Sequence, residues 1–324
     1  MNLVRVSAAL ATVGLLAGCG GTTVSGTSGS QPGSTSSGAS NSSTSGSSGG
    51  ASSSSSASST SQPQVGTSVP GGTLSASMHK ALTAAKSVKF TIARVPVEGS
   101  TATPTSSSSD SGELQIADPM TGTYTDSGSG KRDLIVVGGE PYGYFKQANA
   151  WVKKSASPDE LETRYLVNYT AQLAQNDPRV VADMVSAGTA VVKGKSLIAG
   201  ASVTHYAVTA SFSALIDKQV NSMKSHGCDV LSLPSNRTSL ERSKAKNGST
   251  QLTMDVYLDD QGRLIRFEDP VAASKRGTRD QTTYRDYGAS VDPKAPEGAK
   301  SFAEVRRQMG SSSSSSSASS SSAA

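Results

Sequence analysis

Two cysteines carry the most reactive side chains of this 324-residue sequence, and each stands in a different chemical context. Cys19 directly follows Leu16-Ala17-Gly18 at the end of a short apolar segment, where its sulfur could be converted to a thioether. Cys228 lies two residues after His226, and a thiolate beside a base can act as a nucleophile. The first context suggests covalent modification near the start of the chain, and the second makes Cys228 a candidate nucleophile that has to be weighed against an inert thiol.

The segment before Cys19 has the form of an export signal. Arg5 is followed by a short apolar stretch and then by small residues. The stretch is too short for a hydrocarbon core of roughly 30 Å, which needs about 20 apolar residues. The run that ends in Cys19 resembles the lipobox of bacterial lipoproteins. That resemblance implies that residues 1–18 are a removed signal peptide and that Cys19 carries diacylglycerol on its sulfur; an ordinary secreted protein with an incidental cysteine is the alternative.

The next part of the chain has the composition of a tether. Residues 19–72 carry no charged side chain and consist mostly of Ser, Gly and Thr. Such a segment cannot bury enough apolar surface to offset its chain entropy, so we expect it to be disordered. As a flexible coil it would span about 40 Å on average. Residues 311–324 form a second Ser-rich tail, which leaves residues 73–310 as the predicted folded domain.

Composition and spacing exclude several classes of function. The 30 Lys and Arg residues exceed the 25 Asp and Glu residues only slightly and are spread along the chain, which does not predict a nucleic-acid-binding face. The three histidines, at positions 79, 205 and 226, are scattered, so we expect no metal site. No nucleotide-binding or nucleophile-elbow motif stands in a suitable context, so we expect no cofactor. With Cys19 lipidated, Cys228 has no partner for an internal disulfide.

Hydrophobic periodicity predicts helices and antiparallel strands in the domain. Apolar residues at helical spacing favour helices over 74–85 and from Ser157-Pro158 onward, then a shorter helix capped by Asp177-Pro178 and a helix through 212–223. The predicted strands are 87–92, 113–117, 122–126, 131–137, 190–193, 203–210, 251–258, 263–268 and 278–287. This order indicates an α+β fold in which helices cover one face of an antiparallel sheet.

Two stretches resemble a known family. Val256 to Leu264, with its Asp-Asp-Gln-Gly turn, is followed by Tyr284-Arg285-Asp286-Tyr287-Gly288, and an earlier hairpin leads from Tyr142 to Trp151. This order resembles the actinobacterial LppX/LprG/LprF-type lipoproteins, whose fold is LolA-like. The resemblance implies a curved antiparallel sheet, a half-barrel, with helices over its concave face. It also implies an apolar cavity between the layers that holds acyl chains of a lipid or glycolipid.

Candidate cavity-lining residues lie on the predicted helices. They are apolar or aromatic, and methionine suits an adaptable apolar surface. The set is Tyr165, Tyr169, Met184, Phe212, Ile216 and Met223. The alternative is that the same side chains fill a solid core, as apolar helical stripes commonly do.

The densest basic cluster, residues 274–279, joins two predicted strands. Lys275, Arg276 and Arg279 could meet an anionic headgroup or the membrane at a cavity mouth, or could form a solvated loop. At His226 and Cys228 we predict no catalysis, because no second histidine or oxyanion signature accompanies them.

These observations lead to one functional hypothesis and one alternative. The hypothesis is a lipoprotein anchored on the extracytoplasmic face of the cell membrane that binds a lipid or other amphiphile in an apolar cavity and carries or presents it in the envelope. The alternative is a scaffold lipoprotein that binds a protein or wall polymer on its surface and holds no internal ligand. Neither reading requires an enzyme.

Overall fold

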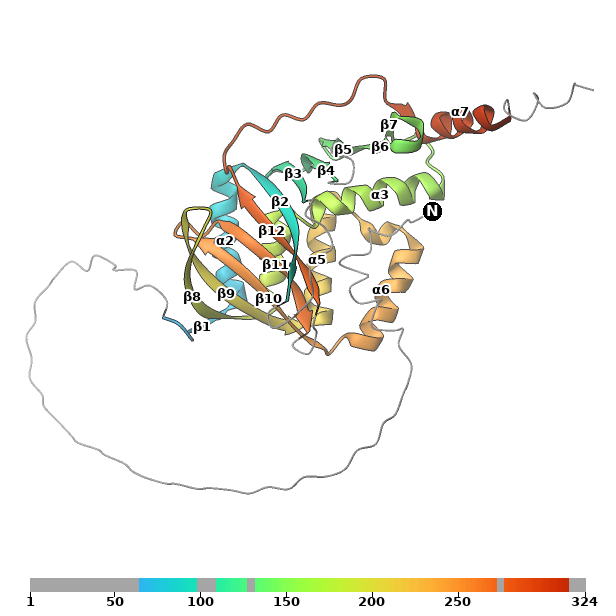
Figure 1. The fold of residues 1–324 in the computed structure, drawn as a ribbon. Coiled ribbons are helices and arrows are strands. Elements are labelled where there is room, and N and C mark those ends of the chain that lie inside the picture. Colours follow the sequence, from blue (N-terminus) through green and yellow to red (C-terminus); the bar gives the residue numbers. More distant parts are fainter. Residues whose placement is uncertain (1–63, 98–108, 127–131, 273–276, 315–324) are drawn as a thin grey trace, which may run out of the picture.

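A single large sheet forms the framework of the protein. The computed structural model describes residues 64–97, 109–126, 132–272 and 277–314. Within them the sheet has 13 strands in the order β1-β8-β9-β10-β11-β12-β2-β3-β4-β5-β6-β7-β13. All neighbours pair antiparallel except β13, which runs parallel to β7. Figure 1 shows the sheet curving around the helices on its inner side.

The strands are long in the β8–β12 region and short at both edges. Their bounds are β1 Ser68–Pro70, β2 Ser87–Pro96, β3 Asp110–Gln115, β4 Thr121–Thr125, β5 Arg132–Val137, β6 Glu140–Phe145, β7 Ala150–Lys153, β8 Thr189–Ile198, β9 Ala201–Ser211, β10 Gln251–Asp259, β11 Leu264–Ala272, β12 Thr278–Arg285 and β13 Lys300–Ser301. The helices are α2 Gly71–Ala85, α3 Glu160–Ala174, α4 Pro178–Val185, α5 Phe212–Ser225, α6 Pro234–Asn247 and α7 Phe302–Ser314, with 3-10 turns η2 Lys146–Ala148 and η3 Val230–Ser232.

The α+β class and the curved antiparallel sheet predicted from the sequence are confirmed. The alternation on β10 shows why the pattern is readable. Met254, Val256 and Leu258 are at most 3% exposed and join the main core, while Asp255 and Tyr257 point to the outer face. One face of the sheet is therefore covered by helices and the other carries polar side chains.

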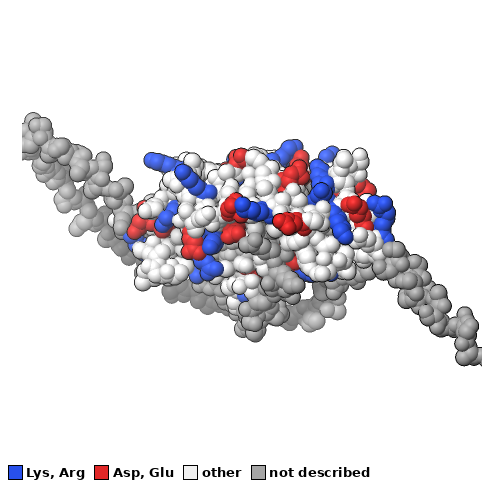
Figure 2. Space-filling view, turned by 90° about the horizontal axis from the view of Figure 1, so that it is seen from above, with Lys and Arg blue, Asp and Glu red and all other residues white. Residues whose placement is uncertain are grey.

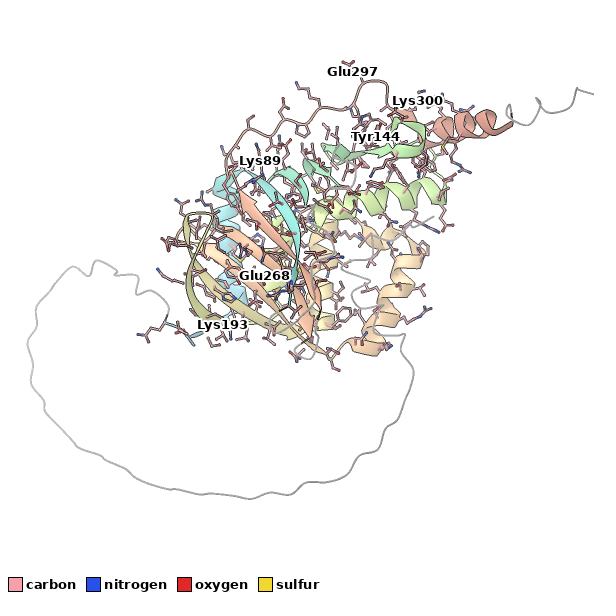
Figure 3. The ribbon with its side chains drawn as sticks, in the orientation of Figure 1. Lys89, Tyr144, Lys193, Glu268, Glu297 and Lys300 are labelled. Atoms are coloured by element: carbon pink, nitrogen blue, oxygen red, sulfur yellow. The ribbon has the colours of Figure 1, made fainter. Side chains whose placement is uncertain are left out.

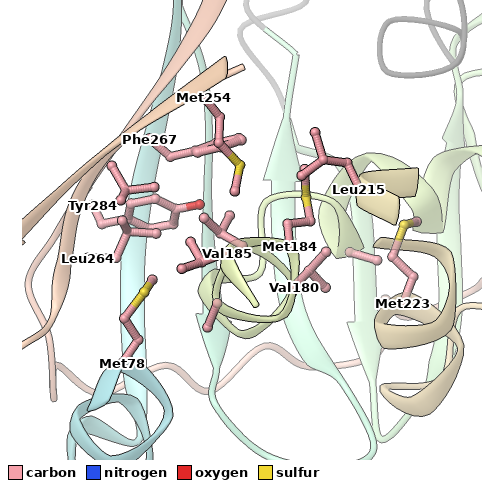
Figure 4. Packing of buried hydrophobic residues seen from close by; sticks show 14 of the residues in the cluster. Met78, Val180, Met184, Val185, Leu215, Met223, Met254, Leu264, Phe267 and Tyr284 are labelled. Carbon is pink, nitrogen blue, oxygen red and sulfur yellow. The ribbon is translucent and has the colours of Figure 1, made fainter. Parts of the chain in front are cut away.

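Helix α4 is the innermost element of the fold. It lies between the sheet and α5, with α2 beside it, and Val180, Val181 and Val185 are completely buried. Figure 4 shows Met254, Phe267 and Tyr284 of the sheet on one side of α4 and Leu215 and Met223 of α5 on the other. A helix of this length is unstable by itself in water, so its order depends on this packing.

Sequence features at both ends fix α4 in place. The Asp177 side chain caps the helix by accepting a hydrogen bond from the Arg179 N–H at 2.9 Å, and Pro178 occupies the first helical position, as predicted. After the helix, the Gly188 carbonyl accepts a hydrogen bond from the Gly71 N–H at 3.0 Å. A Cβ at position 71 would lie 2.2 Å from the Val185 carbonyl oxygen, so this contact requires glycine.

The C-terminal segment returns to the opposite edge of the sheet. After β12 the chain runs to β13, which pairs with β7, and α7 follows. Phe302 and Val305 of α7 pack on Val152 and form a small second core with aromatic residues of β6 and α3. This edge is therefore covered by the end of the chain.

Several boundaries differ from the sequence-based expectation. Strand β1 and the start of α2 lie inside 19–72, the range assigned to the tether, and α7 continues to Ser314, past the predicted domain end at 310. Helix α3 is capped by Asp159 rather than Ser157. The helical spacing of Leu161, Tyr165, Tyr169 and Leu173 predicts that all four share one inward face, but Leu161 lies in the first turn of α3 and is 47% exposed. Helix α6 was not predicted, since only Leu240 among its residues is buried and no apolar stripe marks it.

The packing of α5 gives a stability prediction. Leu215 is 2% exposed in the main core, whereas Leu161 is 47% exposed. Leu215→Ala should lower the free energy of unfolding by about 2–5 kcal/mol, because it removes buried methyl groups and leaves a cavity. The matched variant Leu161→Ala should change it by less than about 0.5 kcal/mol in urea unfolding. Equal effects of the two variants would contradict the described burial.

Candidate functional site

The interior between sheet and helices is the site at which the sequence predicted a ligand cavity. The structure brings four of the predicted lining residues into the main core, where they are 4–5% exposed: Met184, Phe212, Ile216 and Met223. They contact other protein side chains, and α4 occupies the space between the layers (Figure 4). In this structure the four residues therefore line a filled interior.

The other two predicted lining residues belong to an aromatic cluster on the middle turns of α3. The rings of Tyr165 and Tyr169 are 4.7 Å apart, and Tyr165 also contacts Phe145 at 5.6 Å and Phe302 at 5.4 Å between ring centroids. The Tyr165 hydroxyl is buried and makes no hydrogen bond of normal geometry. Burial, together with the neighbouring Tyr169, raises the pKa of Tyr165 well above its usual value. This cluster joins α3 to α7 and β6.

Charged side chains hold the two ends of α4. At its C-terminal end, His79 of α2 bonds Asp183 through Nε2 and Oδ1 at 2.9 Å. At its N-terminal end, Arg179 contacts both carboxylate oxygens of Asp177 and donates through Nη1 to Asp118 at 3.0 Å. The same Asp118 oxygen lies 2.7 Å from Nδ1 of His226, at the end of α5. Polar contacts from α2, α5 and the β3–β4 loop thus surround a helix whose other side is apolar.

The loop before α4 is tied to the sheet. Asn176 accepts a hydrogen bond at its side-chain oxygen from the Thr282 hydroxyl at 3.0 Å, and its backbone carbonyl accepts one from Tyr284 at 3.2 Å. Both donors lie on β12 and face the interior. The contact satisfies polar groups that would otherwise be buried without partners.

The aspartates around α4 are stabilised in their charged form. Burial by itself raises the pKa of Asp183, but the hydrogen bond with His79 and the proximity of the Ser222 hydroxyl outweigh it, and the net pKa is lowered. At Asp118, burial is likewise outweighed by His226 and Arg179, which lower the pKa. Such shifts indicate that these contacts stabilise the charged carboxylates, and with them the folded state, at neutral pH.

A second polar cluster lies on the outer face of the sheet. Arg279 donates to Asp255 at 2.8 Å and to Glu268, and Asp255 also bonds Nε2 of His205 at 2.7 Å. The His205 ring stacks on Tyr257 with centroids 4.3 Å apart. Figure 3 shows Glu268 on this part of the sheet. Burial works against the charge of Asp255, but its partners lower the pKa below the usual range.

Of the three residues predicted to contact a lipid headgroup, the structure describes only Arg279. Arg279 is 12% exposed and is held by two carboxylates, so in this structure it is engaged within the protein. Lys275 and Arg276 lie outside the described residues, as does Cys19. Figure 2 shows basic and acidic side chains interspersed on the face in view.

His226 and Cys228 make different contacts. His226 bonds Asp118, whereas Cys228 is 3% exposed in the main core. Burial, with a further contribution from Asp229, raises the pKa of the Cys228 thiol to about 12. The geometry therefore does not provide an activated thiolate.

A polar groove lies on the side of α4 that faces away from the sheet. Its volume is about 630 Å³, and it runs between the end of α4 and α5. Its lining is rich in hydroxyl and carboxylate groups: Asp183, Ser186, Ala187, Ala214, Asp217, Lys218, Asn221, Ser222 and Ser225. The buried Ser222 hydroxyl makes no hydrogen bond of normal geometry there.

Two further features bear on the class of protein. None of the helices in the described ranges is long and apolar enough to cross a membrane. Among the same residues, no three His, Cys, Asp or Glu side chains are grouped to hold a metal ion.

Comparisons with known proteins give similarity in structure alone. No family model matches the chain, and no curated protein matches its sequence. Mycobacterium tuberculosis lipoprotein LppX is similar over 69% of this chain and 98% of its own, with 11% identity and a TM-score of 0.39. LprF from Mycobacterium bovis is similar over 70% of this chain and 97% of its own, with 14% identity and a TM-score of 0.40. A LolA superfamily protein from Nitrosomonas europaea is similar over 67% of this chain and 92% of its own, with 8% identity and a TM-score of 0.26. The predicted resemblance is confirmed as a structural similarity at low identity.

The carboxylates paired around α4 and in the outer cluster predict loss of stability in acid. The pKa values of Asp118, Asp183 and Asp255 are lowered in the folded protein. Their contribution is therefore complete above the unfolded pKa of about 4 and is lost as pH falls through the lower folded values. The variant Asp183→Asn should cost about 0.5–1 kcal/mol at pH 7, since the pair is partly exposed, and nothing at pH 2. Urea unfolding at both pH values measures this, and an equal deficit at both would contradict it.

The cluster on the outer face of the sheet predicts that replacing Arg279 lowers the stability of the protein strongly. Arg279→Ala should lower the free energy of unfolding by about 3–5 kcal/mol, because it leaves Asp255 and Glu268 without their cation in a mostly buried place. Arg94 offers a matched control, since it pairs with Asp280 but is 44% exposed. Arg94→Ala should cost at most about 1 kcal/mol. Comparable losses in thermal and urea unfolding would argue against the described burial.

Proposed function

We propose that this protein is an envelope lipoprotein, anchored through Cys19, that binds the acyl part of a lipid or other amphiphile between its sheet and helices. In this proposal the ligand takes the place of α4 and is held or handed on at the extracytoplasmic face of the cell membrane. The observation that carries the proposal is the position of α4, a short helix that fills an otherwise continuous apolar concavity.

The walls of the concavity suit an irregular apolar ligand. Methionines contribute from both layers: Met78 on α2, Met223 on α5 and Met254 on β10 are each at most 5% exposed. Methionine has several rotatable bonds and a polarisable sulfur, so a surface built from it can repack around different shapes. The sheet supplies Leu264 and Phe267 beside them (Figure 4).

The free energy of exchange between α4 and an acyl chain is close to balanced. Val180, Val181, Met184 and Val185 are the large apolar side chains that α4 buries. At about 1.5–3 kcal/mol each, they contribute roughly 6–12 kcal/mol. An acyl chain of about 16 carbons offers roughly 13 kcal/mol at about 0.8 kcal/mol per methylene. A ligand of that size therefore provides enough burial to replace the helix.

The surroundings of α4 support its displacement as a unit. The helix adds no strand to the sheet, so every strand pairing remains when it leaves. Its polar contacts, to His79 and Asp118, lie at its ends and outside the apolar interior. Release of α4 therefore costs its apolar burial, these end contacts, the hydrogen bonds of Asn176 to β12 and the backbone contact between Gly71 and Gly188, while the sheet keeps its register.

One observation favours the alternative of a scaffold lipoprotein. The predicted cavity-lining residues Met184, Phe212, Ile216 and Met223 already contact protein on all sides, which suits a solid core. In that case the protein acts through its surface, and α4 is a permanent part of the core.

Locking α4 distinguishes the two functions. In a Cys19→Ser background, the double variant His79→Cys/Asp183→Cys places thiols on α2 and α4, and dibromobimane can bridge them. We expect the uncrosslinked variant to bind the fluorescent fatty acid cis-parinaric acid at least as well as the parent protein. Crosslinking should weaken binding roughly tenfold or more, because the helix can no longer leave.

A matched pair controls for the reagent. Arg94→Cys/Asp280→Cys joins β2 and β12 at a directly paired position and leaves α4 free, so its crosslinked form should bind like the parent. Native mass spectrometry of the full chain should show co-purified lipid. Absence of both lipid and parinaric acid binding would establish the scaffold alternative, and unchanged binding after α4 is locked would place the ligand elsewhere.

A further inference from the structure

The β8–β9 hairpin carries the most exposed large apolar side chain of the described part of the chain. Leu197 is 77% exposed and lies next to the tip, where Ala199 and Gly200 form the turn with φ values of +50° and +83°. Exposed leucines also occur singly on other proteins, so exposure alone carries no conclusion. The surroundings of this leucine supply the further evidence.

The hairpin holds Leu197 outward on a well-packed base. Leu197 pairs with Ser202 and its neighbour Ile198 with Ala201, so the two side chains lie on opposite faces of the hairpin. Ile198 is 5% exposed and packs with Val203 and Ile265. The exposed position of Leu197 is therefore set by strand geometry.

A second exposed apolar residue lies on the same edge. Val65 is 72% exposed, and its side chain lies 4.0 Å from the place a Cβ would take at Gly194 of β8. The described part of the chain has four exposed large hydrophobic residues, Val65, Leu161, Leu197 and Met309, and two of them, Val65 and Leu197, lie along β8. The β8 edge thus presents two exposed apolar side chains, which together are called the apolar patch.

Two lysines border the patch. Lys193 and Lys195 are exposed on β8, and neither forms a salt bridge within the described residues. Lys195 and Leu197 are two positions apart after the bulge at Gly194 and lie on the same face. On the neighbouring β10–β11 turn, Asp259 is held by Arg263, while Asp260 is exposed. Figure 3 shows Lys193 at this edge of the sheet, near β1.

The chain enters the domain from the same end. Strand β1 pairs antiparallel with β8, Ser68 opposite Val191, and Gly66 donates to the Val192 carbonyl at 2.8 Å. Going backward from Ser68 to Gln64, the chain therefore runs along β8 toward the tip of the hairpin. The described chain therefore begins, at Gln64, on the side of β1 that points toward the tip of the β8–β9 hairpin.

We propose that the edge formed by Val65, Lys193, Lys195 and Leu197 is a membrane-contacting surface for an anionic lipid bilayer. The two apolar side chains would enter the headgroup boundary, and the lysines would meet lipid phosphates. So small a patch binds weakly, but the anchor at Cys19, which is part of the proposed function, would hold it near the same bilayer at an effective concentration in the millimolar range. The contact orients the domain with α7 and β7 away from the membrane (Figure 1).

Vesicle binding of the full chain tests this proposal without the lipid anchor. All proteins carry Cys19→Ser and the same N-terminal segment, so differences between them report on the substituted residues. Vesicles of phosphatidylcholine and phosphatidylglycerol at a 7:3 ratio are used in co-sedimentation. Val65→Ser/Leu197→Ser should reduce partitioning roughly fivefold or more, and Lys193→Gln/Lys195→Gln should remove the preference over pure phosphatidylcholine.

The other two exposed apolar residues provide the matched control. Leu161→Ser/Met309→Ser removes the same kind of exposed surface on α3 and α7 and should bind like the parent. In a second measurement, the fluorophore NBD is attached to Leu197→Cys or to Leu161→Cys; Cys228 is 3% exposed and is not labelled in the folded protein. The emission of NBD at position 197 should shift to the blue when vesicles are added, and the emission at position 161 should not. Equal partitioning of the two double serine variants, or equal shifts at positions 197 and 161, would overturn the proposal, whatever the outcome for parinaric acid.

Discussion

The close approach of the α4 segment to the start of α2 is the contact on which the arrangement of the interior depends. Gly71 and Gly188 meet through their backbones, and a side chain at position 71 would overlap the carbonyl oxygens of Val185 and Gly188. Because β1 and α2 adjoin Gly71, this contact also sets where the first strand meets β8. The innermost helix, the first helix and one edge of the sheet are thereby placed relative to one another by two residues without side chains.

Each histidine of the chain is paired with an aspartate, and two of these pairs surround α4. His79 and His226 belong to α2 and the end of α5, and their aspartate partners lie on α4 and in the β3–β4 loop. The third pair, His205 with Asp255, belongs to the outer cluster around Arg279. These polar contacts therefore connect separate elements at the rim of the fold, whereas the centre is held mainly by apolar packing, with the hydrogen bonds of Asn176 to β12 inside it.

The sequence predicts the helices and strands of this fold better than it predicts which of them pack against one another. The alternation on β10, the apolar face of α5 and the Asp177-Pro178 cap each depend on residues close together in the chain, and the structure has them all. The filled interior was not predictable, because Met184 and Met223 give the same helical stripe whether they face a ligand or another helix. Arg279 shows the same limit: its partners lie on β10 and β11, and sequence spacing gives no sign of that pairing. Helix α6, with a single buried residue, lacked the periodicity by which the other helices are recognised.

The two free edges of the sheet are both closed by the ends of the folded chain. Strand β1 covers β8 on one side, and the two-residue β13 covers β7 on the other, where α7 continues. Open edges of large sheets are templates for pairing between molecules, and very short edge strands are a known protection against it. Here the protection on the β7 side comes from residues near the end of the chain. A molecule that lacks residues 300–314 therefore exposes the β7 edge, and truncation before Lys300 would lead first to aggregation between molecules rather than to loss of the interior.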